Sequence, residues 1–313
     1  MVQTFLAFLC LALLAFAATA AQARSAPADA TVKIRLAQDH WPVVPVWLAN
    51  EGPFEFLLDT GTNVTMLSVD LAGRLGLRPI ARVTVESVDG RRLVPYGRLP
   101  EVRVGPHRVQ DVEIVLTDLP HLRTLGSRVS GILGQNVLSH FNFTLDYRKR
   151  HLAFPREGDT LPAGSHRLMA RTDEGRLVIQ GQVMRGGRAL RLVLDSGVSR
   201  VLLRAGLLRP TELELSGDVG GVPAALTLSG SSALRAATVK HLALGHLTLS
   251  NVPAAILRGR SVFTGGAWDA LLPTSLFDWI FFNNVDGFVV VQTTVSDYRR
   301  AIRLQRGPGA DPR

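Results

Sequence analysis

Short apolar runs separated by turn-forming residues dominate the chain, and long stretches of helical periodicity are scarce. For example, residues 83–88 are followed by Asp89-Gly90 and then by residues 91–94, which predicts a β-hairpin with a two-residue turn. The best helix candidate is residues 69–75, a short segment that ends before Gly76. The pattern therefore predicts an all-β fold with minor α content.

An internal repeat divides the chain into two halves. An apolar run ends in Asp-Thr-Gly at residues 59–61, and a second apolar run ends in Asp-Ser-Gly at residues 195–197. Further on, residues 90–105 match residues 230–245 in length, and both segments begin and end with glycine. Two copies of one structural unit explain these matches.

The region between the two copies is rich in Pro, Gly, Asp and Ser, as surface connections are. We therefore predict an N-terminal lobe at residues 32–155, a linker at residues 156–166 and a C-terminal lobe at residues 167–298. The polar residues 305–313 are expected to form a flexible tail.

The N-terminus predicts export. Residues 5–21 are nearly all Leu, Ala and Phe, and Ala21-Gln22-Ala23 then supplies the small-x-small pattern that signal peptidase cuts. We expect residues 1–23 to be a removed signal peptide, which makes the mature protein periplasmic or secreted in a bacterium, without stable membrane insertion. The alternative is an uncleaved anchor, although about 17 residues lie at the lower end of a membrane span. The only cysteine, Cys10, lies inside this segment, so no disulfide is expected.

Composition and motifs exclude several classes of function. The net charge of +9 comes mainly from scattered arginines, and only Arg148-Lys149-Arg150 forms a basic run, so we expect no nucleic-acid partner. The sequence has no His-Glu-x-x-His motif, no Gly-x-Ser-x-Gly motif, no P-loop and no dinucleotide-binding motif. We therefore expect neither a metal nor a cofactor.

Asp59 and Asp195 gain a specific chemistry if a pseudo-twofold axis relates the two halves. A single Asp-Thr-Gly or Asp-Ser-Gly triplet usually only caps a turn. Two triplets in register would bring their carboxylates together, and two adjacent carboxylates cannot both ionise easily, so they would share one proton. One carboxylate would then take a proton from water while its protonated partner polarises a peptide carbonyl.

With these motifs the sequence resembles the pepsin/retropepsin superfamily of aspartic peptidases, in particular the bacterial retropepsin-like proteases. The matching segments are residues 57–62, residues 192–197 and the apolar-apolar-Gly element at residues 131–134. The resemblance implies a bilobal β-barrel fold with two pseudo-symmetric lobes and the active-site cleft between them. It also implies an aspartic endopeptidase that acts as a monomer on a peptide or protein substrate, because one chain carries both aspartates.

The same resemblance implies the role of each site residue. The catalytic residues are Asp59 and Asp195. The active-site loops are supported by Thr60, Gly61, Thr62, Ser196 and Gly197, with Thr60 and Ser196 bonding across the lobe junction. The flap that closes over the substrate is formed by Val88, Asp89 and Gly90.

Two departures from the family pattern leave alternatives open. Val198 stands where the first half has Thr62 and cannot donate a side-chain hydrogen bond, which makes Asp195 the candidate for the protonated aspartate. Pro273 stands where the first half has Gly134, which predicts a local distortion of the second lobe. A catalytically inactive periplasmic peptide-binding protein of the same fold is therefore the main alternative, and an envelope-associated scaffold with a retained N-terminal anchor is a more distant one.

Aromatic residues are few, and they have two interpretations. In a β protein with little aromatic content they usually belong to the core, but they can also line a substrate groove. The residues concerned are Trp41, Tyr96, Trp268 and Trp279. Tyr96 is the best candidate for the groove because it follows the predicted flap.

Overall fold

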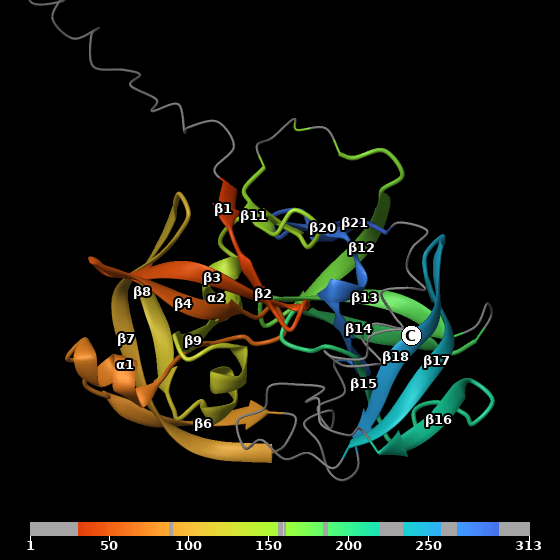
Figure 1. Cartoon of the computed structure of the whole chain (residues 1–313), viewed down its shortest axis with the longest axis horizontal. Helices are drawn as coiled ribbons and strands as arrows, with labels where there is room; N and C mark the ends of the chain where they lie inside the picture. The colour runs from red at the N-terminus through yellow and green to blue at the C-terminus, as the bar shows by residue number, and fades with distance from the viewer. Residues whose placement is uncertain are drawn as a thin grey trace, which may run out of the picture.

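The computed structural model describes residues 31–87, 90–155, 159, 161–183, 187–218, 234–257 and 268–293. Figure 1 shows two lobes, one in orange to yellow and the other in green to blue, joined by a sheet along one side of the molecule. Strands make up most of both lobes and helices are short. The predicted fold class, mostly β with two repeated lobes, is confirmed.

The first lobe is a closed β-sheet with two short helices. Its elements are β2 (Arg35–Ala37), β3 (Trp41–Leu48), β4 (Glu51–Leu58), β5 (Thr65–Leu67), α1 (Val69–Arg74), β6 (Ala81–Ser87), β7 (Gly90–Val104), β8 (His107–Leu116), the 3-10 helix η1 (Pro120–Leu125), β9 (Val129–Leu133) and α2 (Gln135–Leu138). The strand order is β2-β3-β4-β9-β5-β8-β7-β6, and pairing between β3 and β7 closes the sheet.

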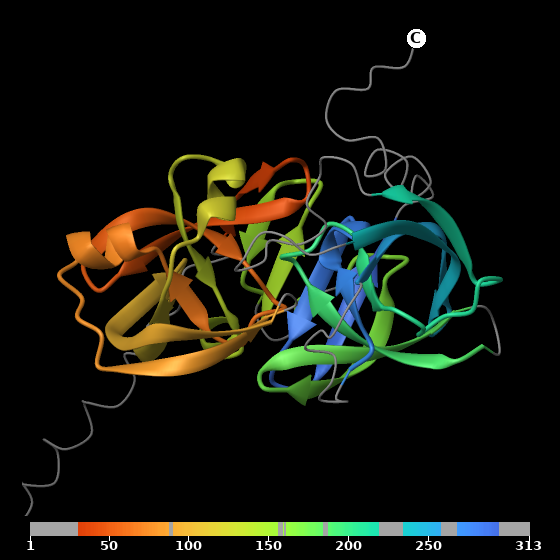
Figure 2. The ribbon, with the colours of Figure 1, turned by 90° about the horizontal axis from the view of Figure 1, so that it is seen from below.

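The second lobe repeats this arrangement, as Figure 2 shows from below. Its elements are β13 (Arg176–Val183), β14 (Ala189–Asp195), β15 (Val201–Arg204), β16 (Leu213–Asp218), β17 (Leu234–Leu244), β18 (Leu247–Leu257), β19 (Ala270–Pro273) and the 3-10 helix η3 (Thr274–Leu276). The strand order is β13-β14-β19-β15-β18-β17-β16, and pairing between β13 and β17 closes it.

A sheet built from both halves of the chain joins the lobes. Its strands are β1 (Thr31–Lys33), β10 (Phe143–Asp146), β11 (His151–Ala153), β12 (His166–Asp173), β20 (Trp279–Asn283) and β21 (Phe288–Gln292), in the order β1-β11-β10-β20-β21-β12. Phe143 pairs with Phe282 at its centre, and their rings stack with centroids 4.6 Å apart, fully buried. Such burial of large aromatic rings fixes one lobe against the other.

The strand registers follow the sequence repeat. In the first lobe β4 runs parallel to β9 with Leu58 opposite Leu133, and in the second lobe β14 runs parallel to β19 with Leu194 opposite Leu272. The second ladder continues without a register shift until Asp195 lies opposite Pro273. The predicted distortion at Pro273 is therefore wrong for this ladder, which keeps its register up to the proline.

Two glycines mark equivalent turns. β7 and β8 are joined at Gly105, and β17 and β18 are joined at Gly245, with φ angles of 56° and 60°. A left-handed conformation of this kind favours glycine in a tight hairpin turn. The predicted equivalence of residues 90–105 and 230–245 is thus confirmed at their C-terminal ends, while residues 230–233 lie outside the described residues.

The local predictions were accurate to about one residue. The predicted helix is α1, which is capped by Ser68 and ends before Gly76. The predicted hairpin is β6–β7, but Gly90 pairs with Ser87 and so belongs to strand β7, not to the turn. Gly90 instead begins β7 with a φ of 135°, a conformation that other residues rarely adopt.

Several predictions concern residues that the structure does not describe. These are the signal peptide at residues 1–23, the tail at residues 305–313 and the flap residues Val88 and Asp89. The lobe boundaries at residues 155 and 167 and the cleft between the lobes also stay predictions. Within the described residues, none of the helices combines the length and the hydropathy needed to span a membrane.

Candidate active site

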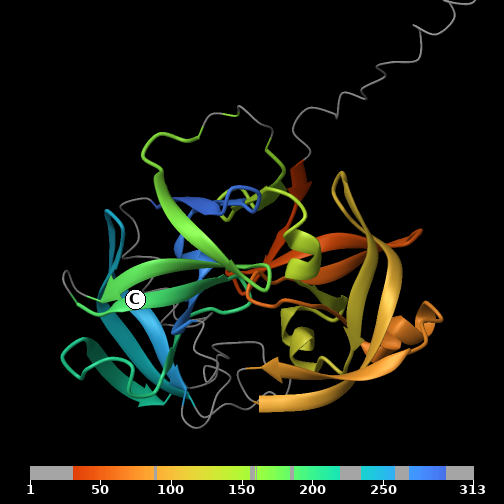
Figure 3. The same ribbon diagram turned by 180° about the vertical axis from the view of Figure 1, so that it is seen from behind.

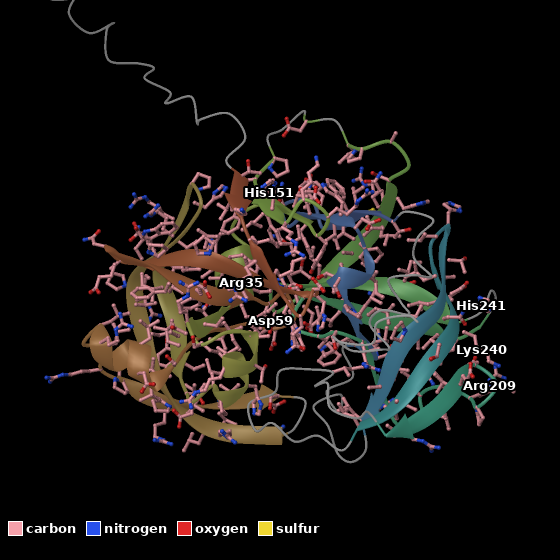
Figure 4. The ribbon with its side chains drawn as sticks, viewed as in Figure 1. Arg35, Asp59, His151, Arg209, Lys240 and His241 are labelled. Carbon is pink, nitrogen blue, oxygen red and sulfur yellow. The ribbon has the colours of Figure 1, made fainter. Side chains whose placement is uncertain are left out.

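The two Asp-Thr/Ser-Gly segments meet where the lobes join. Asp195 is the last residue of β14, and Asp59 directly follows β4, whose Leu57 and Leu58 are fully buried. Figure 4 labels Asp59 near the middle of the molecule, on the side of the first lobe that faces the second. The apolar strands therefore carry each aspartate from the core of its own lobe to the junction.

Thr60 and Ser196 hold the two segments together through reciprocal hydrogen bonds. The Thr60 amide donates to Ser196 Oγ (3.0 Å), and the Ser196 amide donates to Thr60 Oγ1 (3.1 Å). Each hydroxyl then donates to a carbonyl of the opposite lobe, Thr60 to Leu194 (2.8 Å) and Ser196 to Leu58 (2.6 Å). All four bonds are buried, so the expected bonding across the lobe junction is present.

Gly61 and Gly197 leave the space that the opposite aspartate occupies. A Cβ on Gly61 would lie 2.2 Å from Cγ of Asp195, and a Cβ on Gly197 would lie 2.6 Å from Oδ2 of Asp59. Each glycine amide also donates to the aspartate of its own triplet, at 2.8 Å in the first lobe and 2.7 Å in the second. Glycine is required at both positions because any side chain would separate the two aspartates.

The carboxyl groups of Asp59 and Asp195 lie close enough for each to shift the pKa of the other. Burial raises the pKa of Asp59, and hydrogen bonds from the Gly61 and Thr62 amides partly oppose this shift. Burial also raises the pKa of Asp195, and the charge of Asp59 raises it further, to well above its usual value. Asp195 is 5% exposed, whereas Asp59 is partly exposed.

The two aspartates receive different stabilising hydrogen bonds, but the difference does not come from the Thr62 hydroxyl, as the sequence had suggested. Thr62 stabilises the Asp59 carboxylate through its backbone amide and not through its hydroxyl. In the second lobe Val198 is buried in an apolar cluster with Leu202 and Leu271. The aspartate with fewer stabilising amides is nevertheless Asp195, the one expected from the sequence to hold the proton.

Arg176 is a cation beside the two aspartates that the sequence analysis did not single out. It lies at the start of β13 with a side chain that is 14% exposed, and it pairs with Asp173 (3.0 Å) and Glu174 (2.7 Å). Its charge lowers the pKa values of both Asp59 and Asp195, against the effect of burial. No motif signals this residue, because its position depends on the turn between β12 and β13.

Two further side chains reach the paired segments across or beside the junction. Trp41 is fully buried and its Nε1 donates to the carbonyl of Gly197 (3.1 Å), so the core interpretation is correct for this aromatic residue. Gln135, at the start of α2, donates from Nε2 to the carbonyl of Thr60 (3.1 Å). The Gln135 contact was also missed from the sequence, although it follows the recognised element at residues 131–134.

The flap residues are only partly described. Figure 3 shows β6 and β7 running side by side toward the second lobe, which is the direction a flap would take. Gly90 is the residue of β7 nearest the tip. Within the described parts of the chain, no cluster of three or more His, Cys, Asp or Glu side chains is arranged to hold a metal ion.

Comparison with known families gives one result that covers both lobes. A family model described as aspartyl protease matches residues 44–137 and residues 179–272, so each copy of the repeat matches separately. Each matched segment contains one aspartate triplet and the parallel strand beside it. A search of curated proteins gives no match.

Proposed function

Because the chain belongs to the aspartyl protease family, we propose that it is an aspartic endopeptidase in which Asp59 and Asp195 form one catalytic dyad. The observation that carries the proposal is the reciprocal contact at the triplets, where each glycine leaves its side-chain space to the opposite aspartate. The two carboxyl groups would share one proton, and the titration would belong to the pair.

The asymmetry of the site supports a division of roles. Asp195 is the acid, since only the Gly197 amide stabilises its carboxylate, and Asp59 is the base, since two amides stabilise its carboxylate. Asp59 takes a proton from water as the water oxygen attacks the peptide carbonyl carbon, and Asp195 gives its proton to the carbonyl oxygen. Collapse of the tetrahedral intermediate then returns a proton to Asp195, and Asp59 protonates the departing amine.

The rest of the proposal concerns where the enzyme acts, in which oligomeric state and on which substrate. The exported protein acts as a monomer in the periplasm or outside the cell, on a peptide or protein substrate, and residues 88–90 cover the bound chain. Intact-mass measurement of the exported protein tests the first element. A mass starting at Arg24 supports removal of residues 1–23, and a retained N-terminus supports the anchor.

Cleavage of a peptide library between pH 3 and pH 8 tests the activity. Asp59→Asn and Asp195→Asn should each abolish cleavage, whereas the matched change Asp39→Asn, at an exposed carboxylate, should leave it unchanged. A folded wild-type protein that cleaves nothing at any pH would favour the alternative, a peptide-binding protein of the same fold.

A further inference from the structure

A groove of about 840 Å³ lies along β12 and β13, and neither aspartate lines it. Alternate residues of β12 turn their side chains outward there. The exposed side chains of the groove are Arg167, Met169, Arg171, Thr172, Gln180, Gln182 and Arg191. The groove therefore presents three arginines on a strand surface.

Two of the three guanidinium groups are held in place. Arg167 lies over the ring of Phe288, with Cζ 3.6 Å from the ring centroid. Arg191 makes a two-point contact with Asp269, from Nε at 3.0 Å and from Nη2 at 3.1 Å. Arginines that are already ordered lose less conformational entropy when they bind an anion.

The equivalent face of the first lobe is neutralised. Through the strand ladders, Arg35 is equivalent to Arg171 and Glu55 is equivalent to Arg191. In the first lobe Arg35 pairs with Glu55 at 2.7 Å and donates to the carbonyl of Leu125, the last residue of η1, at 2.6 Å. Figure 4 labels Arg35 on this lobe.

In the second lobe the acidic partner is replaced by another arginine. Within the described residues Arg171 makes no ion pair, and the only acidic residue among those lining the groove is Asp173, which is paired with Arg176. The second lobe thus has an arginine at the position of Arg35 but lacks the carboxylate that neutralises Arg35 in the first lobe. Arg191 is paired with Asp269, so in the described part of this face the positive charge without an ion-pair partner is that of Arg167 and Arg171.

We propose that this groove binds an extended acidic segment of the protein substrate, an inference that rests on the proposed function. Arginines recognise carboxylates through paired hydrogen bonds, and Met169, which is 68% exposed, offers an apolar contact between them. A groove that follows a strand suits an extended chain better than a compact anion. The site lies on the hairpin that carries Arg176, and Arg171 is two residues, about 7 Å, from Asp173 at the end of β12.

Binding is measured in the Asp59→Asn variant so that cleavage does not interfere. The readout is the fluorescence anisotropy of a short labelled peptide of alternating glutamate and serine. Adding Arg171→Gln should weaken binding at least about tenfold. The matched control Arg78→Gln, at an exposed arginine of the first lobe, should have little effect. Equal weakening by both changes, or tighter binding of polyphosphate or of anionic vesicles than of the peptide, would overturn the proposal.

A cleavage assay distinguishes a failure of the groove proposal from a failure of the proposed peptidase function. Two substrates share one scissile sequence, and one carries an acidic tail while the other carries a Gln/Ser tail. The acidic tail should lower KM for the wild type, and Arg171→Gln should remove that difference while kcat stays unchanged. Cleavage of both substrates with the same KM contradicts the groove and leaves the dyad intact, whereas cleavage of neither contradicts the dyad.

Discussion

Trp41 and Arg176 occupy equivalent positions in the two lobes, although one is neutral and the other is charged. Trp41 pairs with Ala37 at the end of the β2–β3 ladder, and Arg176 pairs with Asp173 at the end of the β12–β13 ladder. Trp41 donates to Gly197 of the opposite segment, while Arg176 lowers the pKa values of both aspartates. At this pair of equivalent positions the repeat has thus placed a cation near the two aspartates in the second lobe and a neutral side chain in the first.

Replacing Arg176 should move the pH profile upward. A cation favours ionised carboxylates, so Arg176→Leu raises the pKa values of Asp59 and Asp195, and the state with one shared proton persists to higher pH. Both limbs of the kcat/KM profile should therefore shift to higher pH, and Arg176→Lys should restore them in part. A profile of unchanged shape and position in Arg176→Leu would contradict the electrostatic role.

Removing the reciprocal hydroxyls should loosen the lobe junction. Thr60→Ala and Ser196→Ala each leave buried polar groups without partners, which costs about 1–3 kcal/mol in the free energy of unfolding. Urea unfolding measures the loss, with the exposed Thr124→Ala as control. The two losses should not be additive, because both residues belong to one network.

Adding a single carbon to either glycine should stop catalysis. Gly61→Ala or Gly197→Ala forces the opposite aspartate away, and a displacement of about 1 Å at a reacting group costs on the order of 100-fold in rate. Gly73→Ala in α1 is the matched control, because its Cβ would meet nothing within 4 Å. Full activity in Gly61→Ala would show that the two carboxylates need not approach each other.

Asp195→Asn should make the folded protein more stable at neutral pH. The pKa of Asp195 is raised by folding, so its ionisation opposes folding, and stability is lost as pH rises from the unfolded pKa of about 3.8 through the folded value. The melting temperature of Asp195→Asn should exceed that of the wild type at pH 7, and the difference should shrink toward pH 3.

The contribution of Asp269 to stability should depend on pH in the opposite direction. Its pairing with Arg191 lowers its pKa, so its contribution is present above the unfolded pKa and is lost as pH falls through the lower folded value. Asp269→Asn should therefore lower the melting temperature at pH 7, by a small amount because Arg191 is largely exposed. A gain in stability for this variant would show that the directions of the pKa shifts are wrong.

Much of the fold could be predicted because short local sequence patterns specify the repeated unit. Apolar runs ending in Asp-Thr/Ser-Gly, together with glycines such as Gly105 and Gly245 that need a left-handed conformation, specify equivalent strands and turns. Gly90 was predicted in the turn of the β6–β7 hairpin, since Asp89-Gly90 resembles a turn sequence, but Gly90 begins a strand.

The site could be predicted only in part. Asp59, Asp195 and their neighbours belong to motifs, so the sequence names them, and the structure brings them together. Arg176, Trp41 and Gln135 reach the site through tertiary packing that no local pattern encodes. The catalytic roles themselves stay predictions until activity is measured.

The most direct test of the dyad compares kcat/KM for Asp59→Asn, Asp195→Asn and the double variant on one cleaved peptide. Residues that act as a unit are strongly non-additive, so either single change should cost nearly as much as both together. If one single variant keeps substantial activity, or if the two losses multiply in the double variant, Asp59 and Asp195 do not work as one catalytic pair.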